Sequence, residues 1–413
     1  MTEPKKILYA WELGSNYGHV SSFLPLAQQL RTRGHEVTLA IKDLSQIQAL
    51  PGISDFEVIQ APVWLPEIKG LPEPQVCYPD ILQRFGYLDD NGLTGMFKAW
   101  RALYRMVQPQ LLIADHAPTA ILASRNLGFP RAMFGNGFFS PPRTTPMPSM
   151  RPLLPVTPDR LTGSEQAILP NINRVLAAQG LAPLNNLAAM LDVEEDFLIT
   201  PEEFDHYRER GPARYYGPLL NLPAGSRPDW PDAPGTKLFA YIKPGQGHFQ
   251  RLLNQLRESQ FCVLAHAPGL SNAHCRQLET PNLRISPLPV DMSYACTHAR
   301  AVICNAGHGT VMNACLAGLP VLALPMYVEQ NLTARNIERI GAGIMVLNRE
   351  KDPDFVAILN ELVDNPAYIE SARAFADKYA DLDQQALLES LATRCDKLLV
   401  NTRIGTNPAT EMS

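Results

Sequence analysis

The sequence lacks a long apolar run, a paired cysteine motif and an excess of positive charge. No apolar stretch in the 413 residues reaches the roughly 20 positions that a membrane-spanning helix needs. The apolar run in the opening MTEPKKILYAWELG is too short for a signal peptide and is interrupted by Glu12. We therefore expect a cytoplasmic protein without a membrane span, for which a peripheral membrane contact stays open.

Cysteine spacing and charge exclude further classes of protein. The seven cysteines are scattered, odd in number and never spaced as Cys-x-x-Cys, so we expect reduced thiols and no metal site. A formal net charge of -5, with 19% charged residues, lacks the excess of Lys and Arg that a polyanion-binding surface needs, and a local basic patch stays open. Nucleic acid is therefore not an expected partner.

What is present is a regular alternation of apolar strands and helices. An apolar strand from Lys6 is followed by the loop GSNYGHV, a helix that Gly34 would end as a left-handed cap, and the strand EVTLAI. This opening predicts a βαβ unit, and LLIAD (111–115) and RAMFG (131–135) add strands to a parallel sheet.

The middle of the chain is rich in proline. Residues 140–170 carry too many prolines for regular structure, because each proline fixes φ and removes a donor. We expect a lid or wall over a binding site there, with a plain surface loop as the alternative. Helical patterns follow over 164–179 and near 185–190, and DFLIT (196–200) predicts a strand.

The alternation restarts after a stretch rich in Pro, Gly and Asp. The strands expected in this second half cover residues 237–242, 261–268, 282–286, 299–305, 320–325 and 342–347, and the helices cover 250–259, 355–363 and 367–400. The sequence thus predicts an α/β fold of two Rossmann-like domains. Their expected limits are 1–220 and 236–400, with a linker over 221–235 and a disordered tail over 401–413.

The segment from Ala306 to Thr310 is the most informative for chemistry. A strand leads through Gly307-His308-Gly309-Thr310 directly into a helix expected to start near Val311. Unpaired N–H groups and the positive end of the helix dipole favour an anion there, glycine lets the backbone approach closely, and Thr310 adds a hydroxyl. The alternative is a tight turn without a ligand.

A second polar pair follows the next strand. Glu329-Gln330 opens a helix after PVLALP and the loop MYV. Because neighbouring parallel strands present their carboxyl ends to one crevice, this pair is expected beside the glycine loop. A carboxylate and an amide can form hydrogen bonds with sugar hydroxyls. Alternatively, the acidic residue only stabilises the N-terminus of the helix through its dipole.

These segments resemble the family 1 nucleotide-sugar-dependent glycosyltransferases of the GT-B fold, especially bacterial macrolide and flavonoid members. Residues 304–310 resemble the family's T-H-G-G-x-G-S phosphate loop, residues 317–320 its A-x-G-V-P turn, and Glu329-Gln330 its D/E-Q pair. Gly18-His19 and RGHEVT resemble its G-H-x-x-P and R-G-H-x-V-T motifs. The resemblance covers roughly residues 6–345 and implies two facing Rossmann-like domains with a cleft between them.

The resemblance implies a donor site in the C-terminal half. The loop with Gly307, His308, Gly309 and Thr310 would grip the pyrophosphate, and Glu329 and Gln330 would hold the sugar. Asn305 stands at the family's phosphate-contacting His and Asn313 at its ribose-binding Glu, so uridine and thymidine diphosphates both remain open. The base-binding loop corresponds to Pro287-Leu288-Pro289, and Lys243 would reach the phosphates or lie in solvent.

The resemblance also implies a catalytic pair in the N-terminal half. His19 stands at the family's general base, and an imidazole can remove a hydroxyl proton near neutral pH. Asp115 corresponds to the supporting carboxylate that orients the base. A packed ring is the alternative for His19, and His116 is its rival as base. The acceptor-binding candidates are the aromatic residues Phe85, Tyr87, Phe138 and Phe139, which could equally be core.

The expected reaction is transfer with inversion from a UDP or dTDP sugar to a hydroxyl of a small hydrophobic acceptor. The backbone N–H groups would take the developing charge, so no metal or other cofactor is expected. O-, N- and C-linkage stay open, as do monomer and homodimer. Two alternatives remain: a non-catalytic accessory protein, which Asn305 and Asn313 suggest, and a nucleotide-sugar epimerase.

Overall fold

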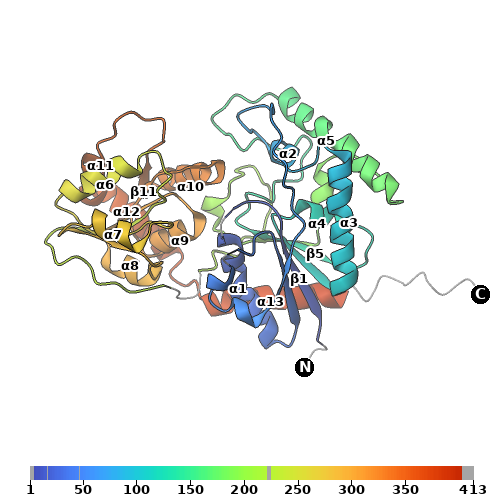
Figure 1. Ribbon diagram of the computed structural model, residues 1–413, viewed down its shortest axis with the longest axis horizontal. Helices are drawn as coiled ribbons and strands as arrows, with labels where there is room; N and C mark the ends of the chain where they lie inside the picture. The colour runs from blue at the N-terminus through green and yellow to red at the C-terminus, as the bar shows by residue number, and fades with distance from the viewer. Residues whose placement is uncertain (1–3, 16, 46, 221–224, 402–413) are drawn as a thin grey trace, which may run out of the picture. The chain divides into compact units, whose positions relative to one another are not determined.

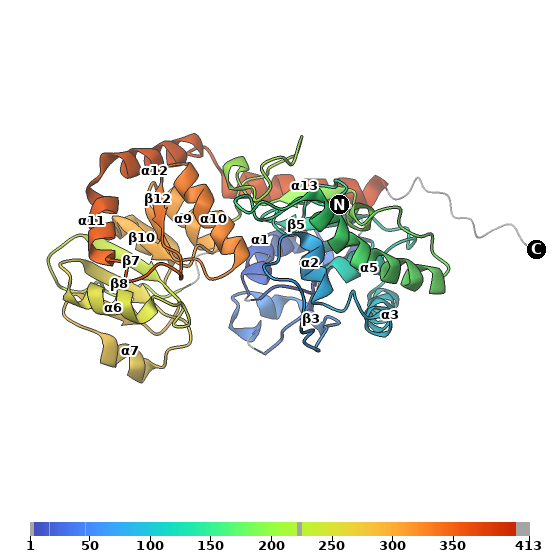
Figure 2. The same ribbon diagram turned by 90° about the horizontal axis from the view of Figure 1, so that it is seen from above.

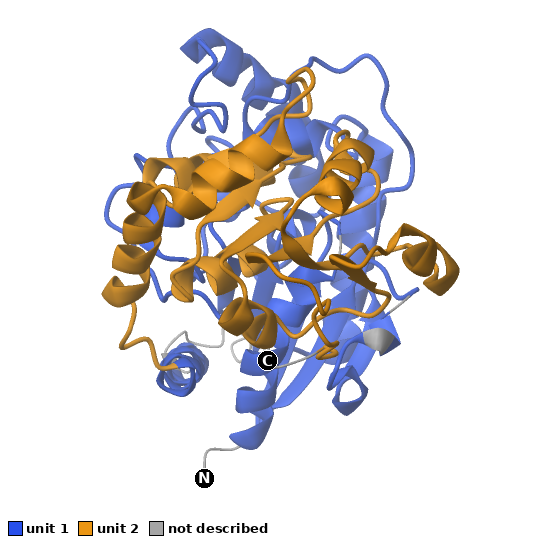
Figure 3. Cartoon of the chain, turned by 90° about the vertical axis from the view of Figure 1, so that its left-hand side faces the viewer, with its two compact units in different colours: residues 1–219, 384–413 blue, residues 220–383 orange. Residues whose placement is uncertain are grey.

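The computed structural model describes residues 4–15, 17–45, 47–220 and 225–401, and the chain divides into two compact units. The first unit comprises residues 1–219 and 384–413, and the second comprises residues 220–383 (Figure 3). Each unit contains a six-stranded sheet whose strands run parallel. The prediction of an α/β fold with two Rossmann-like domains is therefore confirmed.

The sheet of the first unit has the strand order β3-β2-β1-β4-β5-β6. All strands are parallel, but successive strands are added on one side of β1 up to β3 and on its other side from β4 onward, so the order of addition reverses between β1 and β4. Its strands are β1 (Lys6–Trp11), β2 (Glu36–Ile41), β3 (Glu57–Gln60), β4 (Leu111–Asp115), β5 (Arg131–Gly135) and β6 (Glu195–Leu198). The central strands are almost continuously buried, as expected of a parallel sheet covered on both faces. The predicted bounds of β2, β4 and β5 are confirmed, whereas β3 was not predicted.

Helices cover this sheet on both faces (Figure 1). They are α1 (Gly18–Thr32), α2 (Tyr78–Gln83), α3 (Asp90–Val107), α4 (Pro118–Ala123), α5 (Pro158–Ala178) and α13 (Gln384–Asn401), with short 3₁₀ turns η1 (Ile47–Ala49), η2 (Ile53–Asp55), η3 (Ala188–Leu191) and η4 (Glu202–Phe204). Helix α1 packs against α13, while α3 packs against α4 and α5. Gly34, with φ of 90°, follows α1 as the sequence predicts.

The long helix α3 was missed in the sequence, although its signal is present. Asp89 caps its first turn, because its carboxylate accepts hydrogen bonds from the N–H groups of Asn91 and Gly92. The buried residues Leu93, Phe97, Trp100 and Tyr104 follow at helical spacing. Gly92 and Gly95 near the start of the helix weaken the pattern, which explains the omission.

The proline-rich stretch is irregular over only part of the predicted range. Helix α5 begins at Pro158, where proline is favoured because the first-turn N–H needs no partner inside the helix. The Thr157 hydroxyl accepts a hydrogen bond from the N–H of Arg160 and caps this helix. Residues 141–157 remain without a helix or strand, so the expectation of irregular structure up to residue 170 is corrected.

The expected C-terminal domain boundary at residue 400 is also corrected. The predicted helix over 367–400 is divided into α12 (Pro366–Lys378) and α13, and α13 belongs to the first unit. Cys395 of α13 is fully buried, and the Asp396 carboxylate lies 2.8 Å from Nε2 of His35 and also binds Arg33. The last helix thus returns to the first sheet. The predicted tail from residue 402 lies outside the described residues.

The sheet of the second unit has the order β12-β11-β10-β7-β8-β9, with its reversal between β7 and β10. The strands are β7 (Lys237–Tyr241), β8 (Cys262–His266), β9 (Leu283–Ser286), β10 (Ala301–Cys304), β11 (Val321–Ala323) and β12 (Gly343–Met345). The helices are α6 (Phe249–Glu258), α7 (Asn272–Leu278), α8 (Met292–His298), α9 (His308–Leu316), α10 (Val328–Arg339), α11 (Phe355–Asp364) and α12. Helix α6 packs against α11, and α9 packs against α8 and α12 (Figure 2).

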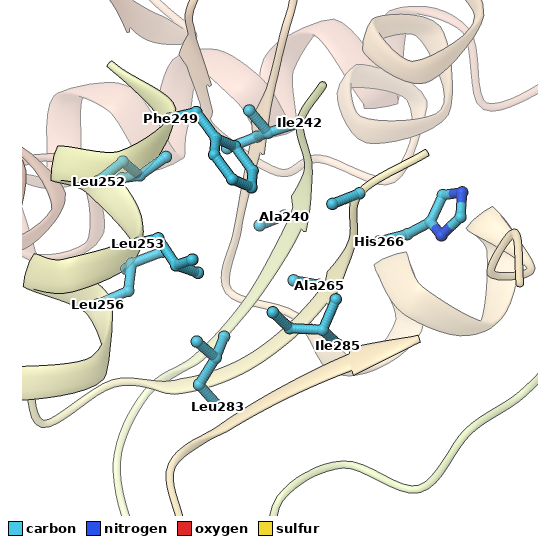
Figure 4. Close-up of a pocket in the computed structure, with 11 residues that line it drawn as sticks. Ala240, Ile242, Phe249, Leu252, Leu253, Leu256, Ala265, His266, Leu283 and Ile285 are labelled. Atoms are coloured by element: carbon cyan, nitrogen blue, oxygen red, sulfur yellow. The ribbon is translucent and has the colours of Figure 1, made fainter. Parts of the chain in front are cut away.

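An apolar core fills the space between this sheet and α6 and α11. Phe249, Leu252 and Leu253 of α6 face Ala240 and Ile285 of the sheet around a small cavity (Figure 4). The cavity measures about 20 Å³, which is roughly the space of one water molecule. It is a packing defect of the core and is too small for a nucleotide.

A buried carboxylate joins the first sheet to the start of α4. Glu12 follows β1, is 1% exposed, and accepts hydrogen bonds from the N–H groups of Thr119 (3.0 Å) and Ala120 (3.2 Å). Burial raises the pKa of Glu12 from 4.5 to about 7, against the opposing effect of these hydrogen bonds. The loops after β1 and β4 are therefore held together by a group that titrates near neutral pH.

We expect Glu12→Gln to change how stability depends on pH. The folded chain retains a proton that the unfolded chain releases, so the wild-type protein loses stability as the pH rises from 4.5 toward 7. Glutamine removes this loss, and the variant should gain about 3 kcal/mol relative to wild type between about pH 4 and 8. Urea unfolding across this range measures the effect. The exposed Glu36→Gln is the control, and parallel profiles for Glu12→Gln and wild type would refute the expectation.

Candidate functional site

His19, Asp115, Lys243, Asn305 and the glycine loop lie at or after the ends of the strands where each sheet reverses its order. In the first unit, these are the loops after β1 and β4, and in the second unit the loops after β7 and β10. Ligands of doubly wound sheets bind in the crevice at such a reversal, because the two loops leave in opposite directions. Each unit therefore offers one site, built from its own loops.

The structure brings His19 and Asp115 into direct contact. Nδ1 of His19, in the first turn of α1, lies 2.7 Å from Oδ1 of Asp115, the last residue of β4. The other carboxylate oxygen accepts a 3.0 Å hydrogen bond from the Tyr9 hydroxyl. The Asp115 side chain is only 3% exposed, whereas that of His19 is 15% exposed. The arrangement is that of an imidazole oriented by a buried carboxylate, which can accept a proton at Nε2.

Aromatic rings and a glycine fix the His19 ring in place. It stacks on Trp11 at a centroid distance of 5.4 Å and lies 5.6 Å from the ring of Phe139. Gly14 has a φ of 88°, and a Cβ added to it would lie 2.8 Å from Nε2 of His19. A larger residue at position 14 would therefore displace the imidazole.

His116, the rival base, has a different environment. It directly follows Asp115, is 3% exposed, and stacks on Phe139 at a centroid distance of 3.4 Å. Burial, followed by the influence of His19 and Lys42, lowers the pKa of His116 well below 6.5. Because it lacks a carboxylate partner and is held neutral, it suits the role of base less well than His19.

The four aromatic candidates for acceptor binding differ in position. Phe139 is half-buried beside both imidazoles, and Phe138 next to it is 4% exposed. Phe85 is half-buried on the loop after α2. Tyr87 is fully buried and its hydroxyl lies 3.0 Å from Oγ1 of Thr119, so in this structure it is a core residue.

In the second unit, the glycine loop delivers the start of α9 to the sheet edge. Ala306, with a φ of 56°, turns the chain after β10, and α9 then begins at His308 with Gly307 as its cap residue. As a glycine, Gly307 has no side chain with which to cap the first turn. A Cβ on Gly307 or Gly309 would meet nothing within 4 Å. The helix N-terminus thus opens onto free space suited to an anion.

Asn305 anchors the loops at this edge. Its Oδ1 accepts a 2.8 Å hydrogen bond from the N–H of Lys243, and its Nδ2 donates to the carbonyl of Leu324 at 2.9 Å. The amide is 4% exposed and joins the strand ends of β7, β10 and β11. Partial burial lowers the pKa of Lys243, whose ammonium group belongs to the loop after β7. The sequence resemblance placed Asn305 at a phosphate-contacting position. In the structure, its side chain instead binds the backbone of the neighbouring loops.

The remaining donor candidates lie on neighbouring loops. Asn313 donates from its side chain to the carbonyl of Gly309 at 2.8 Å, within α9. The side-chain oxygen of Gln330 accepts a 2.9 Å hydrogen bond from the N–H of Met326 and braces the loop before α10. Leu288 is 61% exposed after β9. Glu329 is half-buried in the first turn of α10.

Three residues around His19 were not identified from the sequence. Tyr9 and Trp11 lie inside an apolar strand, where their side chains are indistinguishable from core residues. Gly14 is one of several glycines in loops. Alternation along β1 could have placed Tyr9 and Trp11 on one face of the sheet, but not beside His19 and Asp115.

The described residues contain neither a helix that could span a membrane nor a cluster of metal ligands. Over that part of the chain, no helix has the length and apolar character needed to cross a membrane. Among the same residues, no three His, Cys, Asp or Glu side chains are grouped as metal ligands would be. The seven cysteines are buried free thiols.

Comparison with known families and sequences gives a consistent result. Residues 250–386 match the C-terminal domain family described as erythromycin biosynthesis protein CIII-like. A relative from Mycobacterium bovis, named PGL/p-HBAD biosynthesis rhamnosyltransferase, is 26% identical over 324 residues, which cover 70% of each protein. The sequence relationship thus extends beyond the glycine-loop domain.

Solved structures show the same fold. The calicheamicin glycosyltransferase CalG4 superposes with a TM-score of 0.69 at 18% identity, over 98% of this chain and 100% of that one. The glycosyltransferase VinC, solved in complex with DTDP, has a TM-score of 0.66 at 18% identity, over 94% and 100%. At this identity, the likeness establishes the shared two-domain fold.

We expect Asn305→Ala to destabilise the second unit strongly. The substitution leaves the buried N–H of Lys243 and carbonyl of Leu324 without their side-chain partner, which should cost about 2 to 4 kcal/mol. The matched control is Asn313→Ala, which loses a single hydrogen bond on a half-buried helix surface and should cost less than about 1 kcal/mol. Chemical unfolding measures both, and equal effects would contradict the anchoring role of Asn305.

Proposed function

We propose that the chain is a family 1 nucleotide-sugar-dependent glycosyltransferase of the GT-B fold, which transfers a sugar with inversion to a hydroxyl of a small hydrophobic acceptor. The observation that carries this proposal is the 2.7 Å contact between His19 and Asp115 at the reversal of the first sheet. The donor is a UDP or dTDP sugar, and the reaction uses no metal. His19 is the general base.

The geometry of the first unit supports this role for His19. Asp115 binds Nδ1, and in the proposal Nε2 on the other side of the ring receives the acceptor proton. As the proton arrives, the carboxylate stabilises the imidazolium, and Tyr9 and Trp11 hold both partners in place. The acceptor oxygen then attacks the anomeric carbon on the face opposite the leaving diphosphate, which gives inversion.

The second unit is suited to the departing diphosphate. The N–H groups at the start of α9 and the Thr310 hydroxyl provide donors that do not titrate, beside the open space at Gly307 and Gly309. In the proposal, His308 and Lys243 line the phosphates, Glu329 and Gln330 bind the sugar hydroxyls, Leu288 contacts the base, and Asn313 faces the ribose. Asn305 supports this site by holding the loops rather than by touching phosphate.

The names of the relatives direct the first choice of donor. A structural neighbour was solved with DTDP and a sequence relative is named a rhamnosyltransferase. We therefore place dTDP-rhamnose first and UDP-glucose second among donors to test. For the acceptor, Phe139 beside His19, with Phe138 packed against it, favours an apolar molecule with an exposed hydroxyl.

Turnover of a small acceptor panel tests the proposal. The panel contains 7-hydroxycoumarin, 4-nitrophenol and a cyclohexanol, each with dTDP-rhamnose and with UDP-glucose. Wild type should form one anomer, opposite in configuration to the donor, as read by proton NMR. His19→Ala should lower kcat by about 1,000-fold or more, and Asp115→Asn by about 100-fold or more, since each removes part of the base. Retention of the anomeric configuration, or full activity of His19→Ala, would refute the mechanism.

Nucleotide binding is tested separately through Gly309→Ala. A methyl group at this exposed helical position meets nothing in the unliganded protein but occupies the space next to the helix N-terminus. We expect an unchanged or slightly raised Tm without ligand, and at least about tenfold weaker binding of dTDP and UDP, since ligand binding raises Tm by mass action. Gly163→Ala, at an equally open position in α5, is the control. Equal Tm shifts in the two variants would argue against this loop as the phosphate site.

A further inference from the structure

His116 combines two unfavourable features beside the His19–Asp115 pair. Its φ of 46° lies in the left-handed region that residues with a Cβ rarely adopt. Its ring is buried, and within the described part of the chain neither ring nitrogen has a hydrogen-bond partner. A neutral imidazole has one donor and one acceptor, so both are unsatisfied. Backbone strain and orphaned polar atoms together, next to a reactive group, point to a function.

The ring of His116 is held firmly without the use of its nitrogens. Phe139 stacks on it with an interplanar angle of 12°, and the ring of Tyr78 lies 5.9 Å away on a centroid measure. The backbone carbonyl of His116 accepts a 2.9 Å hydrogen bond from the N–H of Leu13. The loops after β1 and β4 are thus joined at this point, and the orientation of the imidazole is set by packing.

Nδ1 of His116 faces the same glycine as the proton-accepting nitrogen of His19. A Cβ on Gly14 would lie 2.8 Å from Nε2 of His19 and 3.4 Å from Nδ1 of His116. The two nitrogens therefore approach one side of Gly14 and are separated by no more than the sum of these distances. One hydroxyl oxygen that makes two hydrogen bonds of ordinary length can span that gap.

The charge state of His116 suits a hydrogen-bond donor. Burial is the main cause that lowers its pKa well below 6.5, and the neighbouring His19 and Lys42 act in the same direction. The ring of Tyr78 faces it from α2 and is itself fully buried, with a raised pKa. A neutral N–H can donate to an oxygen without competing for the proton that His19 receives.

We infer that His116 is a second catalytic residue, which donates a hydrogen bond from Nδ1 to the attacking oxygen of the acceptor while His19 takes the proton of that oxygen. The O–H proton passes to Nε2 of His19, the oxygen forms a bond to the anomeric carbon, and the bond from that carbon to the diphosphate breaks with its electron pair. This inference rests on the proposed function. The half-buried Phe139 ring covers His116 without ligand and rotates aside to admit the acceptor.

The hydrogen bond from His116 strengthens as the reaction proceeds. Negative charge grows on the oxygen while its proton leaves, so a fixed neutral donor stabilises the transition state more than the bound hydroxyl. The donor has to be in place beforehand, which explains why the fold maintains a left-handed residue with an unsatisfied Nδ1 there. Binding of the acceptor satisfies Nδ1.

Two substitutions separate the hydrogen bond from the packing of the ring. His116→Phe keeps the stacked ring and removes both nitrogens, whereas His116→Asn retains an N–H near the position of Nδ1 and tolerates a left-handed φ. On the panel acceptor that gives most product, we expect kcat to fall about 100-fold in His116→Phe and less than about tenfold in His116→Asn. The Tm shift with dTDP should match wild type in both. Wild-type kcat in His116→Phe would overturn the inference.

A second measurement does not depend on transfer. In protein labelled with ¹⁵N-histidine, the His116 signals, assigned by their loss in His116→Phe, should show a neutral ring at neutral pH and a pKa below the usual value of an imidazole. A His116 ring that is protonated at the pH of the transfer assay would overturn its role as a neutral donor. A wild type that transfers sugar and loses transfer in His19→Ala, but not in His116→Phe, would leave the proposed function intact and remove only this inference.

Discussion

The carboxylate of Asp115 is the group on which the first site depends. It stands at the end of the central strand β4, where the sheet reverses, and each of its oxygens has one partner, the ring of His19 or the hydroxyl of Tyr9. A buried carboxylate without such partners would be costly, so the same hydrogen bonds that stabilise the charge also fix the imidazole. Since Tyr9 belongs to β1 and His19 to α1, the imidazole proposed as the base is connected by hydrogen bonds to the central strands of the sheet.

In the second unit, an uncharged side chain, that of Asn305, holds the loops of the site in position. The Asn305 amide binds the backbone after β7 and the backbone after β11, so it sets the positions of both loops next to the start of α9. The resembled family has a histidine at this place, which could bring a positive charge. Here a positive potential comes from the N-terminus of α9, and the uncharged asparagine holds the loops in position.

The sequence was sufficient for the α/β class and for the limits of β2, β4 and β5, because buried parallel strands are short apolar runs between turn residues. It also paired His19 with Asp115, although only through a family resemblance. The destination of α13 was not predictable, since partners such as Glu195 and His35 are 199 and 361 positions away in the chain. Nor could Gly14 be recognised, because its importance lies in how near two side chains approach it.

The two units solve different chemical problems, and their sites differ accordingly. Removal of a hydroxyl proton needs a group that changes its charge, and the first unit surrounds one such group, His19, with aromatic rings and a carboxylate. Stabilisation of a departing diphosphate needs donors that keep their protons, and backbone N–H groups meet that requirement better than any titratable side chain. Two of the non-glycine residues with positive φ, His116 and Ala306, lie just after β4 and β10, the strands at which the two sheets reverse their order. In the proposed function, the backbone conformation that each ligand requires is built at these two places before the ligand arrives.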